Sequence, residues 1–170
     1  MKVLTLYFSL LLALPVTACK SDCDNIKRPK TEAFADPDRK DKSNKKNHMK
    51  IKMIVNGLTI TATMEDNAAA REFIARLPLE IEFEDYNRTE KIFYPSPKLN
   101  INGVKKGCSP QPGDITIYAP WGNIAIFYKN WPQSNDLIKI GRIDGDNIEA
   151  FKKTGNIKIY LQRIPPTSEI

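Results

Sequence analysis

The sequence contains one histidine, His48, and only three cysteines. Away from His48, no Ser-His or Cys-His pair for nucleophilic catalysis can form, and metal sites built on histidine and cysteine are excluded for the same reason. No glycine-rich stretch has the spacing of a phosphate-binding loop, and none has the GxGxxG pattern of a dinucleotide-binding turn. The composition therefore predicts no metal and no cofactor.

Long apolar runs are also scarce, and the one that stands out covers residues 3–18. It is too short for a membrane span, which takes about 20 apolar residues. Lys2 precedes the run, and Val16-Thr17-Ala18-Cys19 closes it, an ending that resembles a bacterial lipobox. The resemblance implies a signal peptide over residues 1–18 and a lipid on the sulfur of Cys19. We expect a lipid anchor in the bacterial cell envelope, at the periplasmic face or the cell surface; a plain secretory signal cleaved after Ala18 is the alternative.

Residues 19–48 are predicted to be a disordered tether, because their only large apolar side chains are Ile26 and Phe34.

Charge is unevenly placed along the chain. Residues 1–50 hold 11 Lys and Arg against 6 Asp and Glu, whereas residues 51–170 hold 15 against 14. A nucleic-acid-binding domain would concentrate basic charge on one face of the fold. Because the excess of basic charge lies in the leader and the tether, nucleic acid is rejected as a partner. The membrane is expected as a partner through the lipid on Cys19.

With Cys19 carrying the lipid, Cys23 in the tether and Cys108 further along remain. An exported protein meets an oxidising compartment in which a disulfide is permitted. Nothing positions a tether cysteine against Cys108, so free thiols or variable pairing are expected.

Residues 49–164 have the pattern of a single, mainly β domain, followed by a tail over residues 165–170. Alternating strands at 50–55 and 58–64 flank Asn56-Gly57, the strongest short hairpin signal. Asp66 or Asn67 is expected to cap a helix over 68–77, and a second short helix is expected over 146–153. Further strands are predicted at 79–84, 91–94, 114–119, 124–128, 137–143 and 157–163. About eight short strands and two short helices predict a small closed β-barrel.

Residues 66–99, 113–130 and 137–143 together resemble the bacterial cyclophilin-like domain family. Its motifs are matched by Glu84-Asp85-Tyr86, Gly113-Asp114 and Pro120-Trp121-Gly122-Asn123. The resemblance spans about residues 49–164 and implies a cyclophilin-type barrel, but no established general activity.

Prolyl isomerisation needs neither a nucleophile nor a metal, so a degenerate peptidyl-prolyl isomerase is one hypothesis. Cyclophilins proper use an arginine in a Phe-His-Arg strand, but the corresponding residues here are Glu90-Lys91-Ile92-Phe93-Tyr94. Arg142, within a predicted strand, is the candidate catalytic residue if the domain is an isomerase. Its alternative role is an ion pair at the barrel rim, with Asp144 or Asp114.

A second hypothesis is a non-catalytic module that binds a peptide or a small ligand. Trp121 lies in a turn, where such a large side chain is seldom needed, and beside Asn123 it offers an apolar wall with polar groups; its alternative role is to plug one end of the barrel. The candidate ligand-binding residues are Tyr86, Tyr94, Tyr118, Trp121, Asn123, Phe127 and Arg142. A third hypothesis is an accessory subunit that binds another envelope protein.

Overall fold

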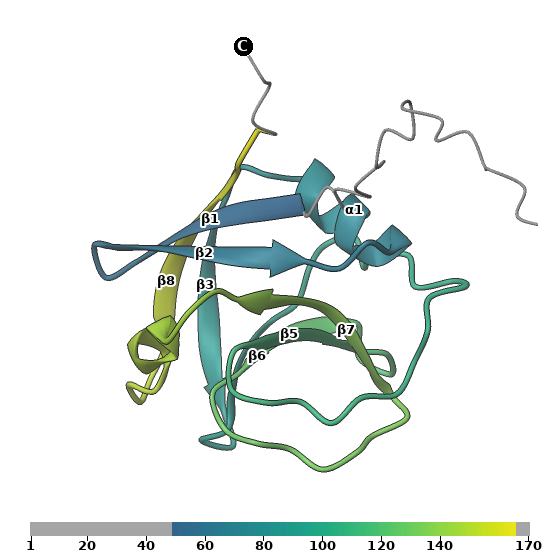
Figure 1. Cartoon of the computed structure of the whole chain (residues 1–170). Helices are drawn as coiled ribbons and strands as arrows, with labels where there is room; N and C mark the ends of the chain where they lie inside the picture. The colour runs from purple at the N-terminus through teal and green to yellow at the C-terminus, as the bar shows by residue number, and fades with distance from the viewer. Residues whose placement is uncertain (1–48, 166–170) are drawn as a thin grey trace, which may run out of the picture. The chain divides into compact units, whose positions relative to one another are not determined.

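Eight antiparallel strands close into a barrel (Figure 1). The computed structural model describes residues 49–165, so the predicted signal peptide, the lipid on Cys19 and the tether lie outside the described residues. The strands are β1 (Met49–Val55), β2 (Leu58–Met64), β3 (Leu79–Tyr86), β4 (Glu90–Phe93), β5 (Asp114–Tyr118), β6 (Asn123–Phe127), β7 (Leu137–Ile143) and β8 (Ile157–Arg163). Around the barrel they follow the order β1-β2-β7-β5-β6-β4-β3-β8. The predicted mainly β, closed eight-stranded barrel is confirmed.

The β1–β2 hairpin forms where the Asn-Gly pair predicts it. Asn56 has φ of 48° and Gly57 has φ of 81°, the two positive values that a type I′ turn requires. Val55 pairs with Leu58 across the turn, and the register continues to Met49 opposite Met64. Alternate residues of both strands then point into the barrel.

One α-helix, α1 (Ala68–Ala75), packs on the barrel through Ala69, Ala70, Phe73 and Ile74. Asn67 caps it, since the side-chain oxygen of Asn67 accepts a hydrogen bond from the backbone N–H of Ala70 at 2.9 Å. The second expected helix is a single short 3₁₀ segment, η1 (Asn147–Phe151), because Phe151 is its only buried residue and so little apolar surface supports no longer helix.

The strands have two apolar faces rather than one. The inner face forms the main core, to which all the strands contribute. A second, smaller cluster lies on the outer wall and consists of Ile92, Ala125, Phe127 and Leu137. Because successive strand residues point to opposite faces, Ile92 and Phe127 point outward while their neighbours Phe93 and Ile126 point into the core.

Two long loops run beside the outer wall, one between β4 and β5 and the other between β6 and β7 (Figure 1). They are joined where Cys108 and Ser134 exchange two backbone hydrogen bonds, of 3.2 and 3.0 Å. Cys108 and Tyr118 pack against the outer cluster. The outer wall is therefore partly covered, and its open part is where the cavity described below is found.

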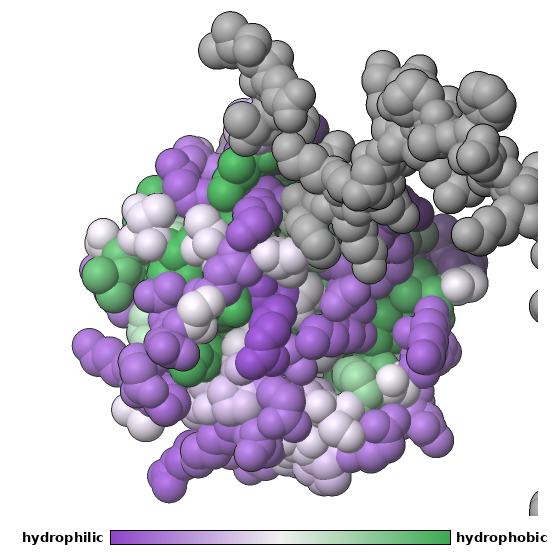
Figure 2. All heavy atoms as spheres, viewed as in Figure 1, coloured by the Kyte–Doolittle hydropathy of each residue, from purple (hydrophilic) through white to green (hydrophobic). Residues whose placement is uncertain are grey.

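On the face seen in Figure 2, hydrophilic side chains are mixed with small hydrophobic areas. This mixture agrees with the near balance of positive and negative charge over residues 51–170. Within residues 49–165, no helix combines the length and the apolar character needed to cross a membrane.

Candidate functional site

A cavity of about 370 Å³ lies against the outer wall, where β4, β5 and β6 meet the ends of β3 and β7. Its lining comes from five strands, two tight turns and the β6–β7 loop. The lining residues are Tyr86, Asn87, Glu90, Ile92, Tyr118, Trp121, Asn123, Phe127, Trp131, Ser134, Asp136 and Leu137. The volume falls within the range of small-molecule sites, which runs from about 300 to 1,000 Å³.

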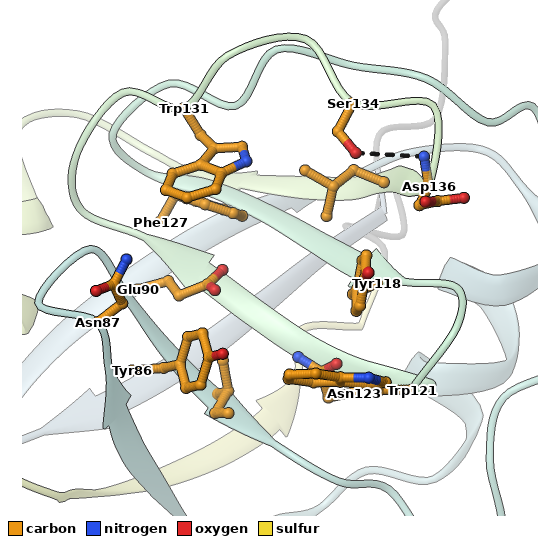
Figure 3. A pocket seen from close by; sticks show the side chains of 12 residues that line it. Tyr86, Asn87, Glu90, Tyr118, Trp121, Asn123, Phe127, Trp131, Ser134 and Asp136 are labelled. Atoms are coloured by element: carbon orange, nitrogen blue, oxygen red, sulfur yellow. Dashed lines mark hydrogen bonds between the residues drawn. The ribbon is translucent and has the colours of Figure 1, made fainter.

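Strand register places a carboxylate between two aromatic side chains. Glu90 on β4 lies opposite Tyr86 on β3 and opposite Phe127 on β6. All three side chains therefore stand on the outer face, in one row across the barrel wall. In Figure 3 the Glu90 carboxylate extends into the space between Tyr86 and Trp131.

The aromatic residues form two groups on either side of Glu90. Trp121 packs edge-on against Tyr118 and Tyr86, with ring centroids 5.3 and 5.9 Å apart. Across the cavity, Trp131 packs against Phe127 with centroids 6.3 Å apart. Trp121 is 44% exposed and Trp131 is 39% exposed, so both keep free ring surface. These tryptophans are the only two in the chain, and both line the cavity.

The polar lining is acidic or neutral. Burial raises the pKa of Glu90 to about 7. Asn123 is only 3% exposed, and its Oδ1 has no hydrogen-bond partner within residues 49–165. Asp136 lies at the rim, where its backbone N–H donates to the Ser134 hydroxyl at 3.4 Å (Figure 3). The site offers acceptor oxygens beside aromatic rings.

The structure brings together five of the seven candidate ligand-binding residues from the sequence. Tyr86, Tyr118, Trp121, Asn123 and Phe127 all line the cavity. Trp121 lies on the outer wall with its ring half-exposed, so it does not fill the end of the barrel.

Tyr94 and Arg142 are the two candidates that do not line the cavity. Tyr94 follows β4 and is 54% exposed. Arg142 donates from Nη1 to Asp114 Oδ1 at 2.6 Å, and Lys139 Nζ lies 2.8 Å from the same oxygen. Of the two ion-pair partners considered for Arg142 from the sequence, Asp114 is the one that it contacts. Asp144 instead accepts hydrogen bonds from Lys50, Thr61 and Thr63.

Glu90 is the lining residue of greatest chemical interest that the sequence did not single out. It is the first residue of β4, and an isolated glutamate at the start of a strand ordinarily faces solvent. In the structure Tyr86 and Phe127 lie opposite it in the register, and the β6–β7 loop, which the sequence does not place beside it, lines the same cavity. Trp131, Ser134 and Asp136 come from that same loop and carry no strand periodicity. The alternation of side chains along a strand gave one indication, because Glu90 and Ile92 are two residues apart and must lie on the same face of β4.

A separate polar cluster lies inside the barrel wall, behind the cavity. Lys91 is fully buried and donates from Nζ to the carbonyls of Lys153 and Gly155, both at 2.7 Å. Its ammonium lies 3.4 Å from Asp85 Oδ1, which also accepts a 2.6 Å hydrogen bond from the Tyr128 hydroxyl. Burial alone would raise the pKa of Asp85, but Tyr128 and Lys91 together hold that pKa below its ordinary value. The Lys91 ammonium and the Asp85 carboxylate both find their partners within this cluster, and Lys91 has no exposed surface, so the cluster fits a structural role.

Within residues 49–165, no group of three or more His, Cys, Asp or Glu side chains is arranged to hold a metal ion. Cys108 forms no disulfide with any described residue. Burial, together with nearby Asp114, raises the pKa of its thiol, which favours the unreactive protonated form.

Comparison with known proteins identifies relatives of this fold. The sequence model of the cyclophilin-like family matches residues 53–162. The solution structure of a hypothetical protein from Archaeoglobus fulgidus is similar, with a TM-score of 0.53 and 16% sequence identity, covering 69% of this chain and 96% of that one. At this identity the similarity concerns the fold alone. No curated protein matches the chain.

Proposed function

The chain belongs to the cyclophilin-like family, and on that premise we propose that its barrel is a non-catalytic binding module for a peptide or a small ligand. The observation that carries the proposal is the cavity on the outer wall, lined by five aromatic side chains around a few polar groups. An apolar cavity with a small number of convergent polar groups is the usual form of a ligand site. Trp121 and Trp131, half-exposed at opposite sides, supply the aromatic anchors that binding sites favour.

The position of Arg142 weighs against an isomerase. A catalytic guanidinium would need to approach the prolyl nitrogen of a peptide bound beside Trp121. Arg142 instead pairs with Asp114 and is not a lining residue of the cavity. Lys139 shares the same carboxylate, so the group forms a small ion-pair network on the barrel surface.

Binding can be measured with a series of blocked tetrapeptides, Ala-Xaa-Pro-Ala, in which Xaa is Leu, Lys or Glu. The full chain is purified in detergent, with detergent alone as the blank. At least one peptide is expected to shift the tryptophan emission, because both tryptophans line the cavity. Trp121→Ala is expected to weaken that binding by roughly tenfold, whereas Tyr94→Ala, an exposed aromatic away from the cavity, is expected to leave it unchanged.

NMR exchange spectra of the same peptides separate the hypotheses. Binding without faster cis/trans exchange is the expected result. Faster exchange that disappears in Arg142→Ala would make the domain an isomerase and overturn the non-catalytic proposal. If no peptide of the series binds at millimolar concentration, the peptide-binding proposal is wrong.

We further propose that the chain is a lipoprotein of the bacterial cell envelope, anchored by a lipid on Cys19 that follows the signal peptide. Two or more acyl chains give stable membrane attachment, and residues 19–48 would then separate the barrel from the lipid surface. The support is the sequence pattern of the leader.

Labelling with a radioactive fatty acid in a bacterial host tests the anchor. The wild-type chain is expected to incorporate the label, and Cys19→Ser is expected to abolish it. Cys23→Ser is the matched control and should keep full labelling, since it lies outside the lipobox pattern. An unlabelled wild-type chain that is cleaved after Ala18 would instead indicate a plain secretory signal.

A further inference from the structure

The cavity contains a carboxylate that no described residue neutralises. Glu90 stands between Tyr86 and Phe127 in the strand register, and its carboxylate extends into the space between Tyr86 and Trp131 (Figure 3). Within residues 49–165, no ion pair or side-chain hydrogen bond involves this carboxylate. A partly buried carboxylate without a partner is unfavourable when ionised, so the site lacks a positive group that a ligand can bring.

The surroundings of Glu90 are suited to a cation rather than to an anion. No Lys, Arg or His of the described residues lines the cavity, and its second ionisable carboxylate, Asp136, adds negative charge at the rim. The half-exposed rings of Trp121, Trp131 and Tyr86 offer electron-rich faces, which attract ammonium groups, most strongly where water is excluded.

A third feature is independent of the carboxylates. Asn123 is almost fully buried against the cavity, and its Oδ1 accepts no hydrogen bond from any residue between 49 and 165. Buried polar atoms are nearly always hydrogen-bonded in folded proteins. An N–H donor brought by a ligand would supply the missing partner, once Trp121 moves enough to admit it.

Resting on the proposed binding function, we propose that this cavity recognises an alkylammonium group, such as the end of a lysine side chain, which pairs with Glu90 between the aromatic rings. The aliphatic stem of such a group packs toward Ile92 and Leu137, the aliphatic residues of the lining. The ammonium donates to the Glu90 carboxylate and lies between the rings of Tyr86 and Trp131, which flank that carboxylate (Figure 3). The raised pKa of Glu90, about 7, agrees with a carboxylate that awaits a cationic partner.

The test compares ligands that differ only in charge. Blocked Ala-Lys-Pro-Ala is titrated against blocked Ala-norleucine-Pro-Ala, whose side chain has a similar aliphatic stem and no ammonium, with the full chain at pH 8. Tryptophan emission reports binding of both. The lysine peptide is expected to bind more tightly, on the order of tenfold. n-Butylammonium is titrated in parallel. If it binds as tightly as the lysine peptide, the cavity recognises a free amine, and if the lysine peptide binds more tightly, the cavity recognises a peptide. Both results support the recognition of an alkylammonium group.

Variants assign the effect to Glu90. Glu90→Gln keeps the size of the side chain and is expected to remove the preference for the lysine peptide while the norleucine peptide still binds. Glu84→Gln is the matched control, because Glu84 is an exposed acid on the same outer face, opposite Ile92, and does not line the cavity.

The outcomes separate this inference from the proposed function. Equal or tighter binding of the norleucine peptide would overturn the alkylammonium inference and leave the binding module standing. A lysine preference that survives in Glu90→Gln would likewise overturn it. If neither tetrapeptide nor n-butylammonium binds, the proposed binding function itself fails for this cavity.

Discussion

Replacing Lys91 by methionine is expected to lower the free energy of unfolding by about 3–5 kcal/mol, the usual effect of removing one partner from a buried ion pair. Lys91 has no exposed surface, and its ammonium binds the carbonyls of Lys153 and Gly155 and lies beside Asp85. Methionine keeps most of the volume but removes the donor that binds the carbonyls of Lys153 and Gly155. It also leaves the Asp85 carboxylate with the Tyr128 hydroxyl and without its cation.

Urea unfolding followed by circular dichroism measures this loss. Lys158→Met is the matched control, because Lys158 is an exposed lysine on β8, which is separated from β4 by β3, and its replacement is expected to change stability by less than about 0.5 kcal/mol. If the two variants are equally stable, the cluster of Lys91, Asp85 and Tyr128 is not a structural element of the barrel. Asp85→Asn should show coupling to Lys91→Met in a double-mutant cycle.

Replacing Glu90 by glutamine is expected to stabilise the protein at pH 8 by roughly 1–2 kcal/mol and to have little effect at pH 4. Burial raises the pKa of Glu90 from 4.5 to about 7 in the folded protein, so folding favours the protonated carboxyl. The wild type therefore has the full stability of a neutral Glu90 below about pH 4.5 and loses it as the pH rises through 7. Because the side chain is partly exposed, solvent screening keeps the effect below the roughly 3 kcal/mol that the pKa difference alone would give.

Thermal and urea unfolding of the wild type and of Glu90→Gln, compared at each pH from 4 to 8, measures this gain. The other titratable lining groups, Tyr86, Tyr118 and Asp136, are the same in both proteins, so the difference isolates Glu90. Glu84→Gln is the control variant, because Glu84 is an exposed acid on the same outer face that does not line the cavity. A constant difference between wild type and Glu90→Gln across this range would contradict the burial of an ionisable Glu90.

The second prediction bears on function as well as on stability. A residue whose ionised form weakens the fold at neutral pH is not explained by the needs of folding. Sites of function commonly carry such unfavourable groups, because they are arranged for a ligand rather than for the empty protein. The expected instability of ionised Glu90 and its expected preference for an alkylammonium ligand have the same cause, an unpaired carboxylate among aromatic rings.

Local patterns predicted those parts of the fold that depend on near neighbours in the chain. Asn56-Gly57 specified a type I′ turn because both residues must take positive φ. Asn67 capped α1 because its side chain reaches the N–H of Ala70, three residues on. Alternation predicted the strands to within a few residues, and β7 and β8 within their observed bounds. The closed barrel followed from the number and spacing of these strands.

The candidate site was predicted only in part. Aromatic residues at Tyr86, Tyr118, Trp121 and Phe127 were recognised as a group, and they do meet at one cavity. Arg142 was grouped with them as a ligand-binding and isomerase candidate, but it pairs with the carboxylate of Asp114 on β5, which was one of its two alternative partners. The β6–β7 loop, which contributes Trp131 and Asp136, has no periodicity that could have placed it.

By itself, then, the sequence determined the strands, the hairpin, the helix cap and the closed barrel, because each depends on contacts within a few residues or on the alternation of a strand. Only the tertiary structure decided which of the adjacent residues Glu90 and Lys91 points into the barrel and which points to the cavity on its outer wall. Lys91 points inward to carbonyls that are 62 and 64 residues away in the chain, and Glu90 points outward beneath a loop some 40 residues on. A charged side chain in a strand is ordinarily solvated, and its burial depends on partners that only the closed barrel brings into place.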